Sequence, residues 1–181
     1  MPKHQKLSLA ELNRLNIEEY KRLEKLPIVI VLDNIRSMSN IGSIFRTSDA
    51  FMIDSIHLCG ITSQPPKNEI RKTALGATES VEWKYYENTM ESIEDLKKDG
   101  YQIISIEQAQ NSLMLQDFQP KPQKKLALIV GNEVKGVEQE VIDASDICLE
   151  IPQFGTKHSL NVSISAGLVI WHVFQNFYLK K

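Results

Sequence analysis

Arg46 and Asn40 lie in a stretch that joins polar groups to the start of a buried helix, LDNIRSMSNIGSIFRTSDAF (residues 32–51). If this stretch is helical, Arg46 presents a planar guanidinium fork, which suits phosphate recognition. Gly42 stands four residues earlier on the same face and leaves room beside Arg46 for a ligand or another backbone. The same residues also fit a helix with a tight glycine contact and a surface arginine, and the stretch alone leaves both interpretations open.

A second candidate group is LIVGNEVKGV (residues 128–137), in which an apolar strand runs into a glycine-rich turn that carries Glu133. The spacing of Gly131 and Gly136 resembles a phosphate-binding loop, but Val137 stands where such a loop needs lysine, so that interpretation is excluded. The sequence also has no GxGxxG dinucleotide fingerprint. What remains is a flexible loop with one carboxylate, suited to a ligand other than a phosphate, or simply a glycine-rich turn.

The third group is PQFGTKHSLNVSISAGLVIWHVF (residues 152–174), where Ser159 and Asn161 stand between a polar turn and an apolar helix. A serine at this point ordinarily caps the helix, while a hydroxyl and an amide two residues apart can equally form a ligand site, and the stretch alone leaves both interpretations open. His158 precedes Ser159 directly, but neighbouring side chains do not face each other on a helix, and the sequence has no GxSxG elbow. A serine hydrolase is therefore excluded.

The C-terminal helix of this stretch is expected to be buried. Ser159, Ser163 and Gly167 recur every four residues and leave one face nearly bare of bulk, so that another backbone can come close. The helix is otherwise apolar nearly all round, which places it in a core or between subunits. We favour a subunit interface, because a chain of 181 residues has little core with which to surround a terminal helix.

Alternating strands and helices must position these three groups. This alternation predicts an α/β fold with a mainly parallel sheet, flanking helices and sites at the carboxyl ends of the strands. Two proline-marked loops interrupt it, at residues 62–69 and 117–125. Strands are expected at residues 28–33, 55–60, 80–86, 101–107, 125–131 and 147–152, and helices at about 41–52, 89–99, 137–144 and 160–178.

The N-terminal residues predict a short helical arm. Residues 8–25 have leucines at helical spacing, and Ser8 and Glu11 have the spacing of a capping box. We expect an arm at residues 1–26 that packs on the body of a single domain, residues 27–181.

Composition restricts the class of protein. The chain is 42% apolar and 24% charged, typical of one soluble globular domain. Its start lacks the apolar core of a signal peptide, and no apolar run approaches the ~20 residues of a membrane span. Cys59 and Cys148 have no metal or redox spacing. We therefore expect a cytoplasmic protein with reduced thiols and no metal.

A net charge of −2 does not predict nucleic-acid binding, although such binding needs only a local cationic patch. Ordinary solvated surface charge is the alternative for each candidate patch. The candidates are Lys67, Arg71 and Lys72, and Lys121, Lys124 and Lys125.

Taken in order, three segments resemble the motifs of the SpoU/TrmH family of SPOUT RNA 2′-O-ribose methyltransferases. They are NIGSIFRT (40–47), GNEVKG (131–136) and IPQFGTKHSLNVS (151–163), and KTALGA (72–77) resembles a further recurrent segment. The resemblance covers about residues 28–175. It implies an α/β knot, in which the C-terminal part forms a trefoil, and a homodimer with that knot at its interface. It also implies S-adenosyl-L-methionine as cofactor and RNA as substrate.

The resemblance also implies roles for single residues. Arg46 would handle the proton of the ribose hydroxyl. Because a free arginine has a pKa above ~12, we expect a substrate phosphate beside Arg46 to relay the proton or to polarise the hydroxyl with it. The other catalytic positions are Asn40, Glu133, Ser159 and Asn161, and the cofactor positions are Gly131, Ile151, Leu160 and, as a less direct match, Ile106.

Two further interpretations stay open beside an active methyltransferase. One is a catalytically silent RNA-binding homologue that acts in RNA folding or assembly, and the other is an α/β enzyme acting on small molecules. Gln153 departs from the family pattern, which has methionine there. Because only a short arm precedes the first strand, the resemblance favours tRNA over rRNA as the substrate.

Overall fold

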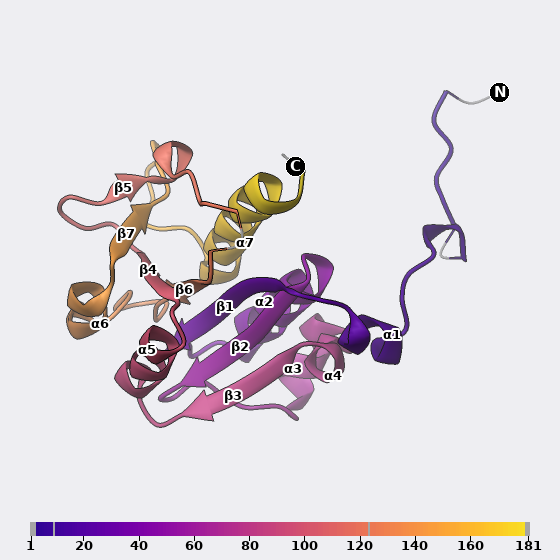
Figure 1. Cartoon of the computed structure of the whole chain (residues 1–181), viewed down its shortest axis with the longest axis horizontal. Helices are drawn as coiled ribbons and strands as arrows, with labels where there is room; N and C mark the ends of the chain where they lie inside the picture. The colour runs from indigo at the N-terminus through magenta and orange to yellow at the C-terminus, as the bar shows by residue number, and fades with distance from the viewer. Residues whose placement is uncertain (1–2, 9, 123, 180–181) are drawn as a thin grey trace.

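The computed structural model describes residues 3–8, 10–122 and 124–179. Its centre is one sheet of seven strands in the order β3-β2-β1-β6-β4-β7-β5, and every neighbouring pair is parallel (Figure 1). The strands are β1 (Leu26–Asp33), β2 (Ile53–Cys59), β3 (Glu82–Tyr86), β4 (Gln102–Ile106), β5 (Leu113–Met114), β6 (Leu126–Val130) and β7 (Ile147–Glu150).

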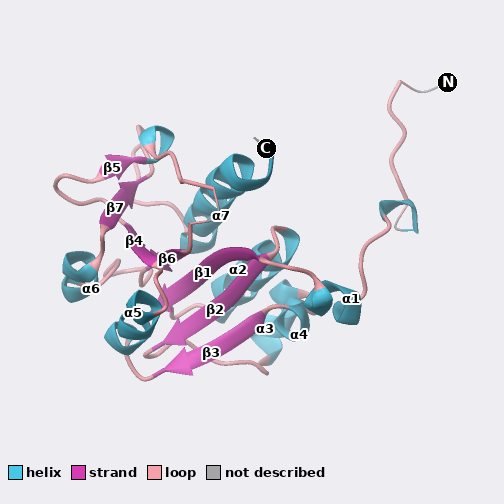
Figure 2. Ribbon diagram, viewed as in Figure 1, coloured by secondary structure: helices cyan, strands magenta, loops and turns pink. Residues whose placement is uncertain are grey.

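Helices cover both faces of this sheet (Figure 2). Alternate residues of β1 point to opposite sides, so Ile28 and Ile30 join one core while Val29 and Val31 join the other. Short 3-10 turns lie at Ala10–Leu12 and Leu115–Asp117, and a π-helical turn at Gln175–Leu179. The helices are α1 (Ile17–Arg22), α2 (Met38–Ala50), α3 (Asn68–Ala74), α4 (Ala77–Ser80), α5 (Thr89–Lys98), α6 (Gln139–Ala144) and α7 (Val162–Phe174).

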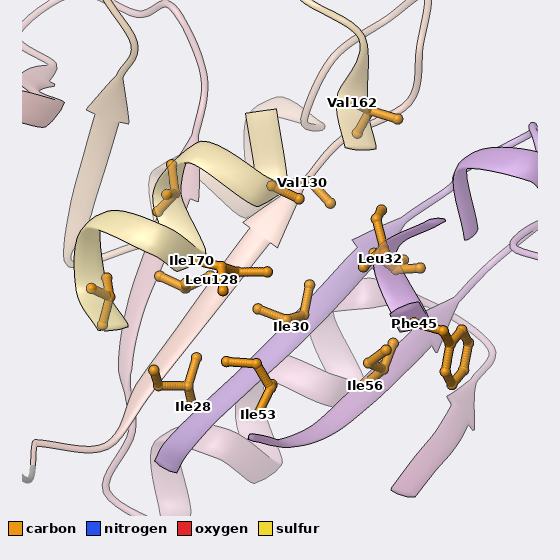
Figure 3. Packing of buried hydrophobic residues seen from close by; sticks show 14 of the residues in the cluster. Ile28, Ile30, Leu32, Phe45, Ile53, Ile56, Leu128, Val130, Val162 and Ile170 are labelled. Carbon is orange, nitrogen blue, oxygen red and sulfur yellow. The ribbon is translucent and has the colours of Figure 1, made fainter. Parts of the chain in front are cut away.

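The larger core lies between the sheet and the layer formed by α2, α3, α4 and α7. Figure 3 shows side chains of β1, β2, β6 and α7 meeting in it. The smaller core lies on the opposite face, under α5 and α6, where Ile93 and Val141 are buried. Within the described residues, none of the helices is both long and apolar enough to cross a membrane.

The structure confirms the predicted α/β class, and all six predicted strands are present. The sheet is wholly parallel and has one more strand, the two-residue β5. Two short helices, α3 and α4, were not predicted. They meet at Leu75 and Gly76, whose φ angles of 50° and 93° turn the chain sharply between them.

The predicted helix at residues 8–25 is wrong in its extent. Only α1 and a 3-10 turn form, and Leu9 lies outside the described residues. Ser8 and Glu11 do pair, since the amide and the hydroxyl of Ser8 donate to Glu11 Oε2 at 2.7 and 2.6 Å, but the capping box that starts α1 is made by Asn16 and Glu19. Asn13, at φ 45°, breaks the helix, and the chain before α1 projects away from the body (Figure 1). Leu7, Leu12 and Leu15 therefore lack a surface to pack on and are exposed.

Candidate active site

The carboxyl ends of β6, β4 and β7 open onto a cavity of about 720 Å³. Three segments form most of its walls, residues 106–108, 130–137 and 151–162, and Gln139, Ile142 and Ser165 complete them. Ligands bind in such crevices at the carboxyl ends of parallel strands in open α/β folds. The volume is in the range of sites that hold a drug-sized molecule.

The turn after β6 is closed by its own hydrogen bonds. Asn132 and Gly136 exchange two backbone hydrogen bonds, of 3.0 and 2.9 Å, and the Asn132 side chain accepts from two further amides inside the turn. A Cβ atom on Gly131 would lie 2.2 Å from the backbone of Gly136, so only glycine fits there. The flexible loop predicted here is therefore a tightly bonded turn.

Glu133 connects this turn to the loop before α2. Its Oε1 accepts from the Ser37 amide and from Asn40 Nδ2, each at 3.0 Å, and its Oε2 accepts from the Arg36 amide at 3.0 Å. Partial burial raises the pKa of Glu133, but these hydrogen bonds outweigh burial and leave the pKa below its ordinary value. Glu133 is therefore held as a carboxylate that fixes one loop on the other.

Asn40 links Glu133 to the start of α7 by hydrogen bonds. Its amide donates to Glu133, and its Oδ1 accepts from Asn161 Nδ2 at 3.1 Å. Asn161 in turn caps α7, because its Oδ1 accepts from the amide of Ser163 at 2.9 Å and from the hydroxyl of Ser163 at 2.7 Å. Three of the five predicted catalytic residues thus form one hydrogen-bonded series across three segments.

Ser159 lies on the wall of the cavity but does not cap α7. The interpretation of Ser159 as a cap is therefore wrong: α7 begins only at Val162, and Asn161 is in the capping position. Ser159 is exposed, and its hydroxyl has no hydrogen-bond partner in the described part of the chain, so it can meet a ligand.

Arg46 is exposed on α2 and does not line the cavity. Among the described residues its guanidinium has no hydrogen-bond or ion-pair partner. Gly42 is a packing glycine, because a Cβ atom there would lie 2.1 Å from Thr73 Oγ1 and 2.3 Å from the carbonyl oxygen of Ile70 in α3. The structure thus shows a tight glycine contact beside a surface arginine, and the exposed guanidinium stays a candidate for phosphate binding.

The four predicted cofactor residues, Ile106, Gly131, Ile151 and Leu160, all line the cavity. The side chains of Ile106, Ile151 and Leu160, with those of Val130 and Val137, give it an aliphatic part, and polar and charged residues line the remainder. This mixture fits a molecule that joins a flat ring to polar and charged groups, as S-adenosyl-L-methionine does.

The prediction missed two residues at the end of β4. Glu107 accepts from the Val137 amide at 2.9 Å, and Gln108 Nε2 donates to the carbonyl oxygen of His158 at 2.6 Å. Glu107 therefore holds the segment 130–137, and Gln108 holds the segment 151–162, against the end of β4. Their position directly after a predicted strand of a parallel sheet was the available signal.

Asp33 and Asn34 form a second missed group at the end of β1. Asp33 is fully buried and accepts from the Thr89 hydroxyl at 2.6 Å and from the Glu138 amide at 3.0 Å. The carbonyl oxygen of Asn34 accepts from Asn132 Nδ2 at 2.7 Å. These bonds anchor the turn after β6 from its other side.

Comparison with known proteins identifies the family of the chain. The SpoU rRNA Methylase family matches residues 27–171. A TrmH-family tRNA/rRNA methyltransferase of Staphylococcus haemolyticus is 31% identical over 159 residues, 88% of this chain and 63% of the relative. The chain therefore spans less than two thirds of the length of this curated relative.

Solved structures share the fold. The TrmH/SpoU tRNA modifying enzyme of A. aeolicus superposes with a TM-score of 0.78 at 23% identity, over 88% of this chain and 80% of that one. An AdoMet-bound rRNA methyltransferase from Sinorhizobium meliloti superposes with a TM-score of 0.76 at 26% identity, over 85% of this chain and 60% of that one.

Proposed function

The chain belongs to the SpoU rRNA methylase family, and we propose that it transfers a methyl group from S-adenosyl-L-methionine to a ribose 2′-hydroxyl of RNA. The series Glu133–Asn40–Asn161 is the observation that carries this proposal. It ties together the three segments that match the family's motifs, at the edge of a cavity of suitable size.

Ile106, Gly131, Ile151 and Leu160 are proposed to hold the cofactor. Support comes from their shared place on the cavity wall and from the relative of Sinorhizobium meliloti, which is an AdoMet-bound enzyme. The cofactor supplies a methyl group that its sulfonium already activates. The chain must therefore align the ribose hydroxyl with that methyl group and remove its proton.

Arg46 is proposed to bind an RNA phosphate and to act with it on the hydroxyl proton. Its guanidinium is exposed and has no described partner, so it is available to substrate. An arginine cannot itself serve as the base, since its pKa is above ~12. Asn40 and Asn161 orient the site, Ser159 contacts the hydroxyl or the cofactor, and Glu133 fixes the loops.

The substrate is proposed to be tRNA, with rRNA as the other class named for the curated relatives. Since the net charge is −2, RNA must be held by local groups such as Lys67, Arg71 and Lys72. We propose a homodimer through α7, because the exposed Ile164, Leu168 and Trp171 follow each other at helical spacing on this helix.

Methyl transfer to RNA tests the proposal directly. Wild-type protein and Arg46→Ala would be incubated with labelled S-adenosyl-L-methionine and undermodified total RNA, which is then separated by size and digested to nucleosides. We expect a labelled 2′-O-methylnucleoside in tRNA with wild type and none with the variant. Cofactor binding without transfer to any RNA would indicate a silent RNA-binding homologue instead, and label in the base would refute ribose methylation.

A further inference from the structure

Glu107 is a carboxylate on the cavity wall that the proposed reaction does not use. It follows β4 directly, and its backbone amide donates to the carbonyl oxygen of Leu149 at 2.9 Å, which extends the pairing of β4 with β7. Ile106, Val137 and Ile142 line the same cavity. A carboxylate beside aliphatic side chains needs hydrogen-bond donors.

Two backbone amides already orient this carboxylate. Oε1 of Glu107 accepts from Gln108 at 2.8 Å, and Oε2 accepts from Val137 at 2.9 Å. A Cβ atom on Gly136 would lie 2.2 Å from Oε2, so the close approach of the turn requires glycine. A carboxylate has about four lone-pair sites, and the two amides leave about two of them for a ligand.

The other carboxylate of the cavity is differently employed. Glu133 turns toward β1 and accepts from three donors of the protein, those of Arg36, Ser37 and Asn40. Glu107, at the β4 side, accepts from two. The cavity therefore has one carboxylate committed to structure and one with capacity to recognise a ligand.

A ribose with adjacent 2′- and 3′-hydroxyls supplies two donors that a single carboxylate can accept. Dinucleotide-binding folds use an acidic residue after a strand for this purpose, although their glycine fingerprint is absent here. The aliphatic groups beside Glu107 suit the base attached to such a ribose.

We propose that Glu107 accepts hydrogen bonds from the ribose hydroxyls of the adenosyl cofactor and makes the site selective for ribose over deoxyribose. This inference rests on the proposed function, since it takes the cofactor to be S-adenosyl-L-methionine. Glu107 then has two separable roles, because its bond to the Val137 amide holds the turn whether or not a ribose is present.

Calorimetric titration of two ligands separates these roles. The ligands are S-adenosyl-L-homocysteine and its 2′,3′-dideoxyribose analogue, and the proteins are wild type, Glu107→Gln and Gln108→Ala. Hydrogen bonds to a charged group are worth about 10- to 100-fold in affinity, so wild type should prefer the ribose ligand by that factor. In Glu107→Gln the preference should fall to less than about 3-fold, by the same reasoning.

Gln108→Ala is the matched control. It removes the side-chain bond to the His158 carbonyl but leaves the backbone amide that orients Glu107. Both ligands should weaken alike in this variant, and the preference for ribose should persist. Thermal unfolding without ligand verifies that each variant folds.

An unchanged preference in Glu107→Gln, or no preference in wild type, would overturn the inference and leave the proposed function intact. Parallel weakening of both ligands in Glu107→Gln would assign Glu107 to the turn alone. If wild type binds neither ligand, the proposed cofactor and this inference both fail.

Discussion

At the scale of a single side chain, Arg46 can be replaced with little effect on the fold, because it is exposed and its guanidinium has no partner among the described residues. In Arg46→Lys the charge is kept but the planar fork that grips a phosphate is lost. If a phosphate-bound guanidinium handles the proton, kcat should fall about 100-fold or more, the scale of general acid–base contributions. Single-turnover methylation of the purified RNA substrate measures it.

The melting temperature of Arg46→Lys should match that of wild type within error. A cofactor affinity equal to that of wild type would show in addition that the site is intact. Turnover at the wild-type rate would refute the need for the guanidinium fork.

His57 makes stability depend on pH. It is 4% exposed, and its Nδ1 lies 2.7 Å from the Ser92 hydroxyl. Burial, and after it the positive charge of Lys84, lower the pKa of His57 to about 4, against a smaller opposing effect of Asp95. Below pH ~6.5, His57 binds a proton in the unfolded chain but stays neutral in the folded chain until the pH approaches 4. The free energy of unfolding therefore falls as the pH decreases from ~6.5 toward 4.

Urea unfolding at pH 7.5 and pH 5 tests this effect. Wild type should lose about 2 kcal/mol more than His57→Gln between these two values, since each pKa unit is worth about 1.4 kcal/mol. Comparison with the variant removes the contribution of carboxylates, which titrate in both proteins. An equal loss in both would mean that His57 is protonated in the folded state.

At the scale of elements, Gly42 controls how α2 packs on α3. An alanine in a helix interior gains about 1 kcal/mol over glycine from propensity alone. Here its Cβ would meet Thr73 Oγ1 at 2.1 Å and the Ile70 carbonyl oxygen at 2.3 Å, so the helices must separate. Two contacts this short place the cost in the upper part of the ~1–3 kcal/mol typical of overpacking, so after the gain in propensity Gly42→Ala should lower the free energy of unfolding by about 1–2 kcal/mol.

A second variant tests the cause of that loss. Thr73→Ala removes the nearest side chain but not the backbone oxygen of Ile70, so combining it with Gly42→Ala should restore stability only in part. A Gly42→Ala protein as stable as wild type would show that moving α3 costs no more than the gain in helix propensity.

Periodicity predicted the elements that are long and regular. A short apolar run rich in branched residues, such as residues 28–33, favours a buried strand over a helix. Strand β1 is indeed fully buried from Ile28 to Asp33. The turn at Leu75 and Gly76 was missed because it places a leucine at positive φ, against ordinary preference. Helix α3, before this turn, is too short for a periodic pattern to be reliable.

The site shows the same division. Motif order brought Asn40, Glu133 and Asn161 into one group, and the structure joins them by hydrogen bonds. Glu107 bonds to Val137, and Gln108 bonds to His158, residues far away in the sequence. No local pattern predicts such pairs, so these two roles require the three-dimensional arrangement of the strands.

At the scale of the whole molecule, α7 presents an unusual surface. Ile164, Leu168 and Trp171 are between 41% and 55% exposed and lie along one side of the helix, while its other side is buried in the core. Trp171 also packs on Phe51 of the segment after α2, with ring centroids 5.7 Å apart. An apolar stripe of this kind on a rigid helix is suited to a second copy of the chain.

Leu168→Glu places a charge in the middle of this stripe. If α7 forms the dimer interface, a buried carboxylate without a partner there costs several kcal/mol, and the variant should be monomeric where wild type is dimeric. Light scattering after size exclusion, at matched concentrations, measures the mass. The control is Leu23→Glu, whose leucine is 40% exposed against 42% for Leu168 but lies after α1, away from the stripe. Leu23→Glu should remain dimeric, because the new charge lies outside the proposed interface. The two substitutions match in chemistry and nearly in exposure, so a difference in mass would come from their position alone. A monomeric wild type, or a dimeric Leu168→Glu, would refute α7 as the dimer interface and leave its exposed apolar side chains to another role.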